Sequence, residues 1–157
     1  MSPGRDVRIM HSFTNILVHC VWSTKKREPV LSSDIRDRLR PYLGGIAREN
    51  KMKALAIGGA ADHLHVLISL PATLSAAKTL QLLKGNSSKW IHETFPKLGS
   101  FEWQEGYGAF TIGISGVDAT IAYIRNQTEH HRARSFREEF LAMLRRHGFD
   151  YDERMLD

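Results

Sequence analysis

The 157-residue sequence has only one cysteine, Cys20, and no long hydrophobic run. A single cysteine excludes an internal disulfide and is typical of a protein kept in a reducing cytosol. No segment approaches the roughly 20 consecutive apolar residues that a membrane helix needs. The first residues, 1–11, are polar and charged and lack the apolar stretch of a signal peptide. We therefore expect a soluble protein that stays in the cytoplasm.

Internal repeats, low-complexity blocks and linkers rich in proline, glycine or serine are also missing. Their absence predicts one domain over residues 1–157, with an N-terminal extension at 1–11 and a helical C-terminal tail at 132–157. Acidic side chains are fewer than basic ones, 17 against 22, which gives a formal net charge of +5. This balance favours an anionic partner such as a phosphate backbone, although a solvated excess of basic side chains would look the same.

Hydrophobic periodicity and turn residues divide the chain into alternating strands and helices. We expect a strand at 13–24, a helix from Ser32 or Ser33 to about 50, a hairpin at 53–70, a helix at about 75–95, a strand at 108–115, a helix from about 116, and a last helix after a Ser135–Glu138 capping box. The order predicts an α+β fold, a ferredoxin-like (RRM-like) split βαβ antiparallel sheet, followed by two helices. Helices would cover one face and leave the other for function.

Two histidines interrupt the apolar strand "DHLHVLIS" at residues 62–69. His63 and His65 point to the same face because strand side chains alternate, and they lie about 7 Å apart along the strand. Two neutral imidazoles on one face form half of a site for a divalent metal. Asp62 could orient one imidazole or belong only to the turn. The pattern alone also fits histidines that are merely hydrogen-bonded, so a third ligand is needed.

The segment "YIRNQTEHHR" supplies candidates for that third ligand and for a nucleophile. Tyr123 and Gln127 are four residues apart, which places them on one helical face, about 6 Å apart along the axis. A glutamine amide oxygen can bind a metal, and a tyrosine hydroxyl beside it can attack a phosphodiester whose charge the metal neutralises. A tyrosine at the edge of the core and a solvated glutamine would give the same spacing, so the residues alone leave the question open.

Five segments together resemble a known family, the IS200/IS605-type single-tyrosine transposases of the HUH endonuclease group, including their REP-associated branch. The resemblance covers roughly residues 12–127. It rests on "LVHCVWSTKKREPVL" (17–31), "ADHLHVLISLP" (61–71), "LLKGNSSKWI" (82–91), "WQEGYGAFTIG" (103–113) and "YIRNQ" (123–127). The tail beyond Gln127 is similar to that of the REP-associated branch.

The resemblance implies a role for each matching residue. His63, His65 and Gln127 match the ligands of Mg²⁺ or Mn²⁺, and Tyr123 matches the nucleophile that cleaves single-stranded DNA and becomes joined to a 5′-phosphate. It also implies DNA hairpins as the recognised substrate and a homodimer, in which the tyrosine helix often completes the partner's site. Such an enzyme would act on DNA of the nucleoid.

Basic and aromatic side chains are candidates for contacts with DNA. The basic candidates are Lys25, Lys26, Arg27, Lys84, Lys89, Arg125, Arg132 and Arg134, and the candidates for stacking on bases are Trp22, Trp90, Trp103 and Tyr107. Trp22 and Trp90 have apolar neighbours, which favours a place in the core. His130 and His131 follow the tyrosine and could be further ligands, DNA contacts or plain surface residues.

Two other functions stay open at this point. A hairpin-binding regulator could keep the fold without cleaving DNA, although all four candidate active residues are present. An RNA-binding module could share the sheet order, but the aromatic pattern of RNP motifs is absent. We expect a metal-dependent transposase that acts through Tyr123.

Overall fold

The computed structural model describes residues 12–127, 134–152 and 154. Its centre is an antiparallel four-stranded sheet with the strand order β2-β3-β1-β4. The strands are β1 (Ile16–Ser23), β2 (Lys53–Ala60), β3 (His63–Leu70) and β4 (Gly108–Thr111). β1 pairs with β3 along their full lengths, so Ser23 lies opposite His63 and Val21 opposite His65. The α+β class and the hairpin at 53–70 are confirmed.

Within the described residues, four α-helices surround the sheet: α1 (Ser33–Glu49), α2 (Ala76–Thr94), α3 (Val117–Arg125) and α5 (Phe136–Arg146). Serine hydroxyls cap three of them, because Ser32, Ser75 and Ser135 each accept a hydrogen bond from a backbone N–H in the first turn. α1 continues through Pro41, and α2 continues through Gly85.

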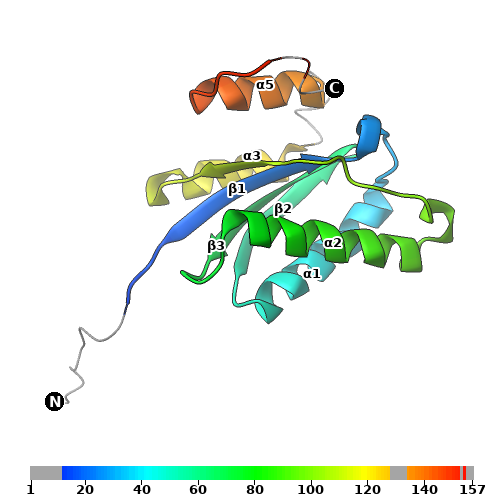
Figure 1. Ribbon diagram of the computed structural model, residues 1–157, viewed down its shortest axis with the longest axis horizontal. Helices are drawn as coiled ribbons and strands as arrows, with labels where there is room; N and C mark the ends of the chain where they lie inside the picture. The colour runs from blue at the N-terminus through cyan, green and yellow to red at the C-terminus, as the bar shows by residue number, and fades with distance from the viewer. Residues whose placement is uncertain (1–11, 128–133, 153, 155–157) are drawn as a thin grey trace.

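α1 and α2 lie on one side of the sheet and enclose the main core (Figure 1). Alternate residues of β3, Leu64, Val66 and Ile68, point into this core together with Cys20 and Trp22 of β1. The period of two in the sequence therefore separates these core residues from His63 and His65, which point to the other face.

The other face of the sheet is not open, contrary to expectation. α3 and α5 both lie over it (Figure 1). Ile124 of α3 packs on Ala56 and Leu67, whereas Phe136 of α5 packs with Val21 and Phe110. Because these strand residues are apolar, the second face gains stability from being covered, and His63 and His65 become buried between sheet and helices.

One expected strand ends earlier than the sequence suggested. β4 ends at Thr111, not at 115, because a 3₁₀ turn over Ile114–Gly116 redirects the chain into α3. α3 itself ends at Arg125 with Asn126 as its C-cap. His130, His131 and Arg132 lie outside the described residues. Among the described residues, no helix has both the length and the apolar character needed to span a membrane.

Candidate active site

The two histidines of β3 meet under α3 and α5, and both side chains are completely buried, with 0% exposure. Each ring uses its Nδ1 to contact a neighbour. His63 Nδ1 donates a hydrogen bond to the Asp62 carboxylate, at 2.8 Å, so Asp62 does orient an imidazole. His65 Nδ1 lies 2.8 Å from Nε2 of His19 on β1. Such partners fix the ring orientations and direct both Nε2 atoms to the same space.

His19 is a functional candidate that the sequence analysis missed. Burial, followed by the neighbouring His65, lowers its pKa to about 3, so the ring is neutral at physiological pH. A neutral His19 can accept the proton of His65 Nδ1 at its own Nε2. His65 Nε2 is then the ring nitrogen that could bind a cation in place of a proton. Strand alternation alone places His19 only on the same face as Val21. The β1–β3 register of the structure, in which Val21 lies opposite His65, brings His19 to the site.

α3 brings the predicted nucleophile to the histidines, and the residues just after it bring the predicted third ligand. The ring of Tyr123 approaches that of His65 edge-on, with 5.6 Å between the ring centres. Gln127 is 1% exposed, and its Oε1 lies 2.8 Å from His63 Nε2. The four side chains singled out in the sequence, distant along the chain, are thus gathered in one place.

A glycine allows α3 to approach the sheet this closely. A Cβ added to Gly58 on β2 would lie 2.3 Å from the carbonyl oxygen of Ile124, the residue next to the tyrosine. Any side chain at this position would push α3 away from the strand, because contacts this short do not occur between non-bonded atoms.

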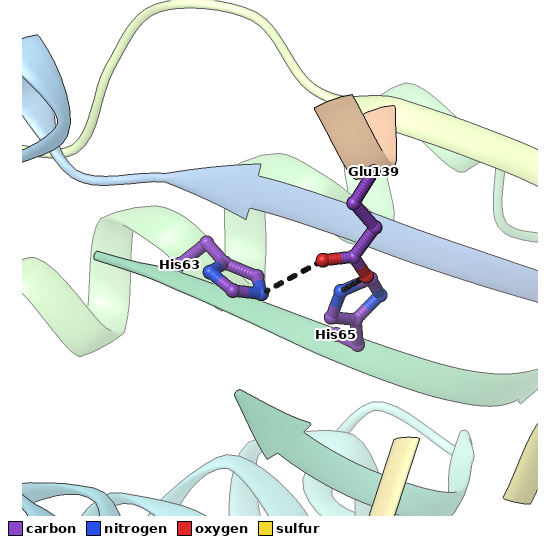
Figure 2. Close-up of side chains that lie close together, drawn as sticks. All are labelled: His63, His65 and Glu139. Atoms are coloured by element: carbon purple, nitrogen blue, oxygen red, sulfur yellow. Dashed lines mark ion pairs between the residues drawn. The ribbon is translucent and has the colours of Figure 1, made fainter. Parts of the chain in front are cut away.

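α5 contributes a carboxylate that the sequence analysis did not identify. Glu139 is buried, and its Oε1 lies 2.9 Å from His65 Nε2, while its Oε2 lies 3.8 Å from His63 Nε2 (Figure 2). The same carboxylate accepts hydrogen bonds from the hydroxyl of Tyr123 and, at 3.2 Å, from Nε2 of Gln127. One acidic side chain therefore contacts all four of the predicted residues.

The sequence did carry a signal for Glu139. It lies three residues after Phe136 and four before Met143, on the apolar stripe with which α5 contacts the sheet. A charged residue on such a stripe is a reason to look for a buried partner. The capping box drew attention to Glu138 instead, and that residue does cap the helix with Ser135.

The donor set fits a divalent cation. The ligand atoms of His63, His65 and Glu139 lie within 4.8 Å of one another. Moreover, His63 Nε2 and Gln127 Oε1 face each other at 2.8 Å although Asp62 already takes the proton of His63 Nδ1. Two lone pairs at that distance repel unless a second proton on the ring or a cation compensates them. Imidazole nitrogens with amide and carboxylate oxygens are suitable ligands for Mn²⁺ and Mg²⁺.

The same contacts set the protonation of the nucleophile. Burial, then the hydrogen bond to Glu139 and its negative charge, raises the pKa of Tyr123 above its ordinary value. For Glu139, burial alone would raise the pKa, but the hydrogen bond and charge of His65 and the hydrogen bond of Tyr123 outweigh it and hold the pKa well below its usual range. At neutral pH the phenol is protonated and the carboxylate is charged, so the phenol cannot act until its proton leaves.

The basic residues proposed to contact DNA occupy different surroundings. Lys25, Lys26 and Arg27 form a short 3₁₀ turn after β1, in which Lys25 pairs with Glu102 at 2.7 Å. The ammonium of Lys84 donates to two backbone carbonyls, those of Gln104 and Gly106, each at 2.8 Å, and Lys89 is exposed on α2. Arg125 lines a groove of about 680 Å³ beside the edge strand β2, together with Arg36 and Arg40.

The four aromatic candidates also differ in their surroundings. Trp22 and Trp103 are buried and pack against each other in the main core. Trp90 is half-buried and stacks on Tyr42. Tyr107 alone among the four is exposed, with 44% of its surface accessible. A base could therefore stack on Tyr107 without any rearrangement of the core.

Comparison with known proteins places the chain in a family. The sequence profile of the family described as "Transposase IS200 like" matches residues 12–127, well over half of the chain. The chain belongs to the IS200-like transposases. This membership confirms the resemblance and supports a DNA-cleaving and DNA-rejoining enzyme.

Named relatives agree with this assignment. The ISDra2 transposase TnpA of Deinococcus radiodurans is 26% identical over 114 residues, which cover 69% of this chain and 81% of the relative. The transposase for the insertion sequence element IS200 of Salmonella typhimurium is 26% identical over 132 residues, 80% of this chain and 86% of the relative.

Solved structures share the fold. A crystal structure of a candidate transposase from Deinococcus radiodurans superposes with a TM-score of 0.62 at 26% identity, and the match covers 81% of this chain and 98% of that one. A REP-associated tyrosine transposase bound to a REP hairpin superposes with a TM-score of 0.59 at 16% identity, over 83% of this chain and 74% of that one. The match to the family profile ends at residue 127, so Glu139 lies outside the profile.

Proposed function

We propose that this transposase cleaves and rejoins single-stranded DNA at sites marked by hairpins, with Tyr123 as nucleophile and a divalent cation, Mg²⁺ or Mn²⁺, as cofactor. His63, His65 and Gln127 would hold the cation, and Glu139 is placed to be a further ligand. The observation that carries the proposal is the single cluster in which Tyr123 contacts, through Glu139, every one of these candidate ligands.

The chemistry follows from the residues around the phenol. When bound, the cation would neutralise the charge of the scissile phosphate and stabilise the leaving oxygen. The Tyr123 oxygen forms a bond to phosphorus while the bond to the 3′-oxygen breaks, which leaves a 3′-hydroxyl and a 5′-phosphate on the tyrosine. The phenol donates its hydrogen bond to Glu139, so its proton has an acceptor in place. Because the phosphotyrosine conserves the energy of the broken bond, rejoining needs no ATP.

In this chain the tyrosine lies beside the histidines of the same subunit. We propose that the protein works as a homodimer, as the family resemblance implies, and that it acts on nucleoid DNA in the cytoplasm. The hairpin specificity is supported by the basic groove lined by Arg36, Arg40 and Arg125 and by the fold shared with a transposase solved on a REP hairpin.

The test is a search for the covalent intermediate. The protein is incubated with labelled, hairpin-bearing single strands and Mn²⁺ or Mg²⁺, and adducts are separated on a denaturing gel. We expect a labelled protein band that requires the metal and disappears in Tyr123→Phe, because phenylalanine keeps the ring and removes the attacking oxygen. Tight hairpin binding without any adduct would show a non-cleaving regulator, and preference for the RNA version would show an RNA-binding module.

A further inference from the structure

A second pocket lies next to the candidate active site. Its volume is about 360 Å³, within the size range of sites for small organic ligands. The walls come from the end of β1, from the segment before β4, from α5, and from the chain after α5. Its lining includes the aromatic side chains of Tyr107, Phe136 and Phe149.

The pocket and the active site share a wall. The ring of Phe136 stacks on that of His63, with 4.4 Å between their centres, and Phe136 also lines the pocket. Ser23, another lining residue, lies opposite His63 in the β1–β3 ladder. A group held in the pocket is therefore separated from a candidate metal ligand, His63, by the ring of Phe136.

The lining favours a flat, neutral ring over a phosphate. Tyr107 and Phe149 expose 44% and 52% of their surfaces, so both rings are accessible to a ligand in the pocket. Bases stack on such rings with a worthwhile gain in binding free energy. Glu105 and Asp150 also line the pocket, and their carboxylates would repel a phosphate but can accept hydrogen bonds from the exocyclic amine of adenine, cytosine or guanine.

The rim that carries Tyr107 is held in place. Lys84 of α2 donates hydrogen bonds to the carbonyls of Gln104 and Gly106, both 2.8 Å away. Gly106 has φ +84, a conformation that glycine adopts without strain. The loop is thus fixed from the opposite side of the sheet before any ligand arrives, which lowers the entropy cost of binding.

We propose that this pocket holds one unstacked, amine-bearing base of the single-stranded DNA substrate, beside the phosphate that Tyr123 attacks. The assignment rests on the proposed function. It goes beyond that function by giving α5 and the chain after it, which lie outside the family profile, a role in positioning the substrate.

The test measures affinity for 12-nucleotide single strands by fluorescence anisotropy at neutral pH without metal. The probes are oligo-dA, oligo-dC, oligo-dT and an abasic 12-mer with the same backbone. Tyr107→Ala and Phe149→Ala are compared with Phe13→Ala, which removes an aromatic ring that is 91% exposed and outside the pocket. Both pocket residues are about half exposed, and urea denaturation of each variant checks that the fold is retained.

We expect oligo-dA and oligo-dC to bind more tightly than oligo-dT, and the abasic strand most weakly. Tyr107→Ala and Phe149→Ala should each lower the affinity for oligo-dA about tenfold, in line with the loss of one stacking contact. Tyr107→Phe should restore binding, and Phe13→Ala should change nothing. The salt dependence should stay the same in all variants, since no phosphate contact is removed.

Equal affinity of the wild-type protein for abasic and base-bearing strands would overturn the proposal, as would unchanged binding in both pocket variants. Photo-crosslinking with 5-iodocytosine, which keeps the exocyclic amine, placed along a mixed-sequence strand gives a second readout: attachment to Tyr107 or Phe149 is expected, and attachment only elsewhere would contradict the proposal. Failure of the proposed function looks different: base-dependent binding would persist in wild-type protein and in Tyr123→Phe, while no covalent adduct formed in either.

Discussion

The two faces of the sheet are built from the same strands but are stabilised in different ways. On the α1–α2 face, β3 contributes Leu64, Val66 and Ile68 to a core of apolar contacts. On the α3–α5 face it contributes His63 and His65, whose ring nitrogens are matched one by one to neighbouring polar atoms. Apolar burial stabilises roughly in proportion to area and tolerates changes of shape. Buried polar groups depend on individual partners, and each loss leaves another group unsatisfied.

The two faces therefore contribute differently to stability and to function. The α1–α2 face carries the main core that keeps the sheet folded, whereas the α3–α5 face has smaller apolar clusters and, between them, five polar side chains that depend on one another. Substitutions on one face should therefore reduce stability, and substitutions on the other should reduce metal binding and cleavage. Four changes test that separation, beginning with the largest effect.

Ile68→Ala on the apolar face should lower the free energy of unfolding by about 2–5 kcal/mol, the usual cost of a cavity in a packed core. Ile68 is fully buried and points away from the histidines. Urea denaturation measures the loss. Well below the unfolding transition, the variant should bind Mn²⁺ as the wild type does; a parallel loss of Mn²⁺ affinity would show that the faces are not separable.

His65→Ala on the polar face should weaken Mn²⁺ binding about 100-fold or more, since even residues that only orient a metal ligand contribute 10- to 100-fold. Electron paramagnetic resonance of free Mn²⁺ gives the affinity without any need for activity. His147→Ala, which removes an exposed histidine stacked on Phe110, is the matched control and should leave affinity unchanged. Equal Mn²⁺ binding by wild type and His65→Ala would remove the ligand assignment.

Gly58→Ala tests the position of α3 without touching any candidate ligand. The new methyl group would meet the backbone of Ile124, so we expect a loss of about 1–3 kcal/mol in stability. Adduct formation through Tyr123 should fall further than stability alone explains, because the displaced helix carries the nucleophile. Calorimetry combined with the adduct assay separates the two; full adduct formation in a destabilised protein would contradict the proposed contact.

His19→Asn should make stability less sensitive to acid. With a folded pKa of about 3, His19 stays neutral in the native state, whereas the unfolded chain takes up a proton below pH 6.5. The unfolded state therefore binds more protons between pH 6.5 and 3, and wild-type stability falls through this window as pH decreases. The slope from this one residue approaches about 1.4 kcal/mol per pH unit. The assignment would be contradicted if the free energies of unfolding of wild type and variant changed equally with pH between pH 7 and 4.

Much of this arrangement could be predicted because it depends on local periodicity. Strand alternation placed His63 and His65 on one face and Leu64, Val66 and Ile68 on the other. Helical spacing placed Tyr123 and Gln127 together. The family resemblance then joined two elements that local patterns could not relate, and the structure shows these four side chains in one cluster.

The remainder depended on tertiary contacts that local patterns do not contain. The apolar stripe of α5 showed that the helix packs on something, but not which face of the sheet it covers. Glu139 reaches the site only because of that docking, from a segment beyond the family profile. The place of His19 could be predicted only with the β1–β3 register, in which Val21, two residues further along β1, lies opposite His65. The prediction of an open functional face was wrong for the same reason, because α3 and α5 cover that face.

The most direct test of the account is to locate the covalently attached nucleotide by mass spectrometry. Trypsin should release residues 98–125 as one peptide, after Lys97 and ending at Arg125, and this peptide contains two tyrosines, Tyr107 and Tyr123. After reaction with hairpin-bearing single strands and Mn²⁺, fragmentation should place the 5′-phosphonucleotide on Tyr123. A nucleotide found on Tyr107, or on no tyrosine of this peptide despite cleaved DNA, would contradict the role assigned to the buried phenol.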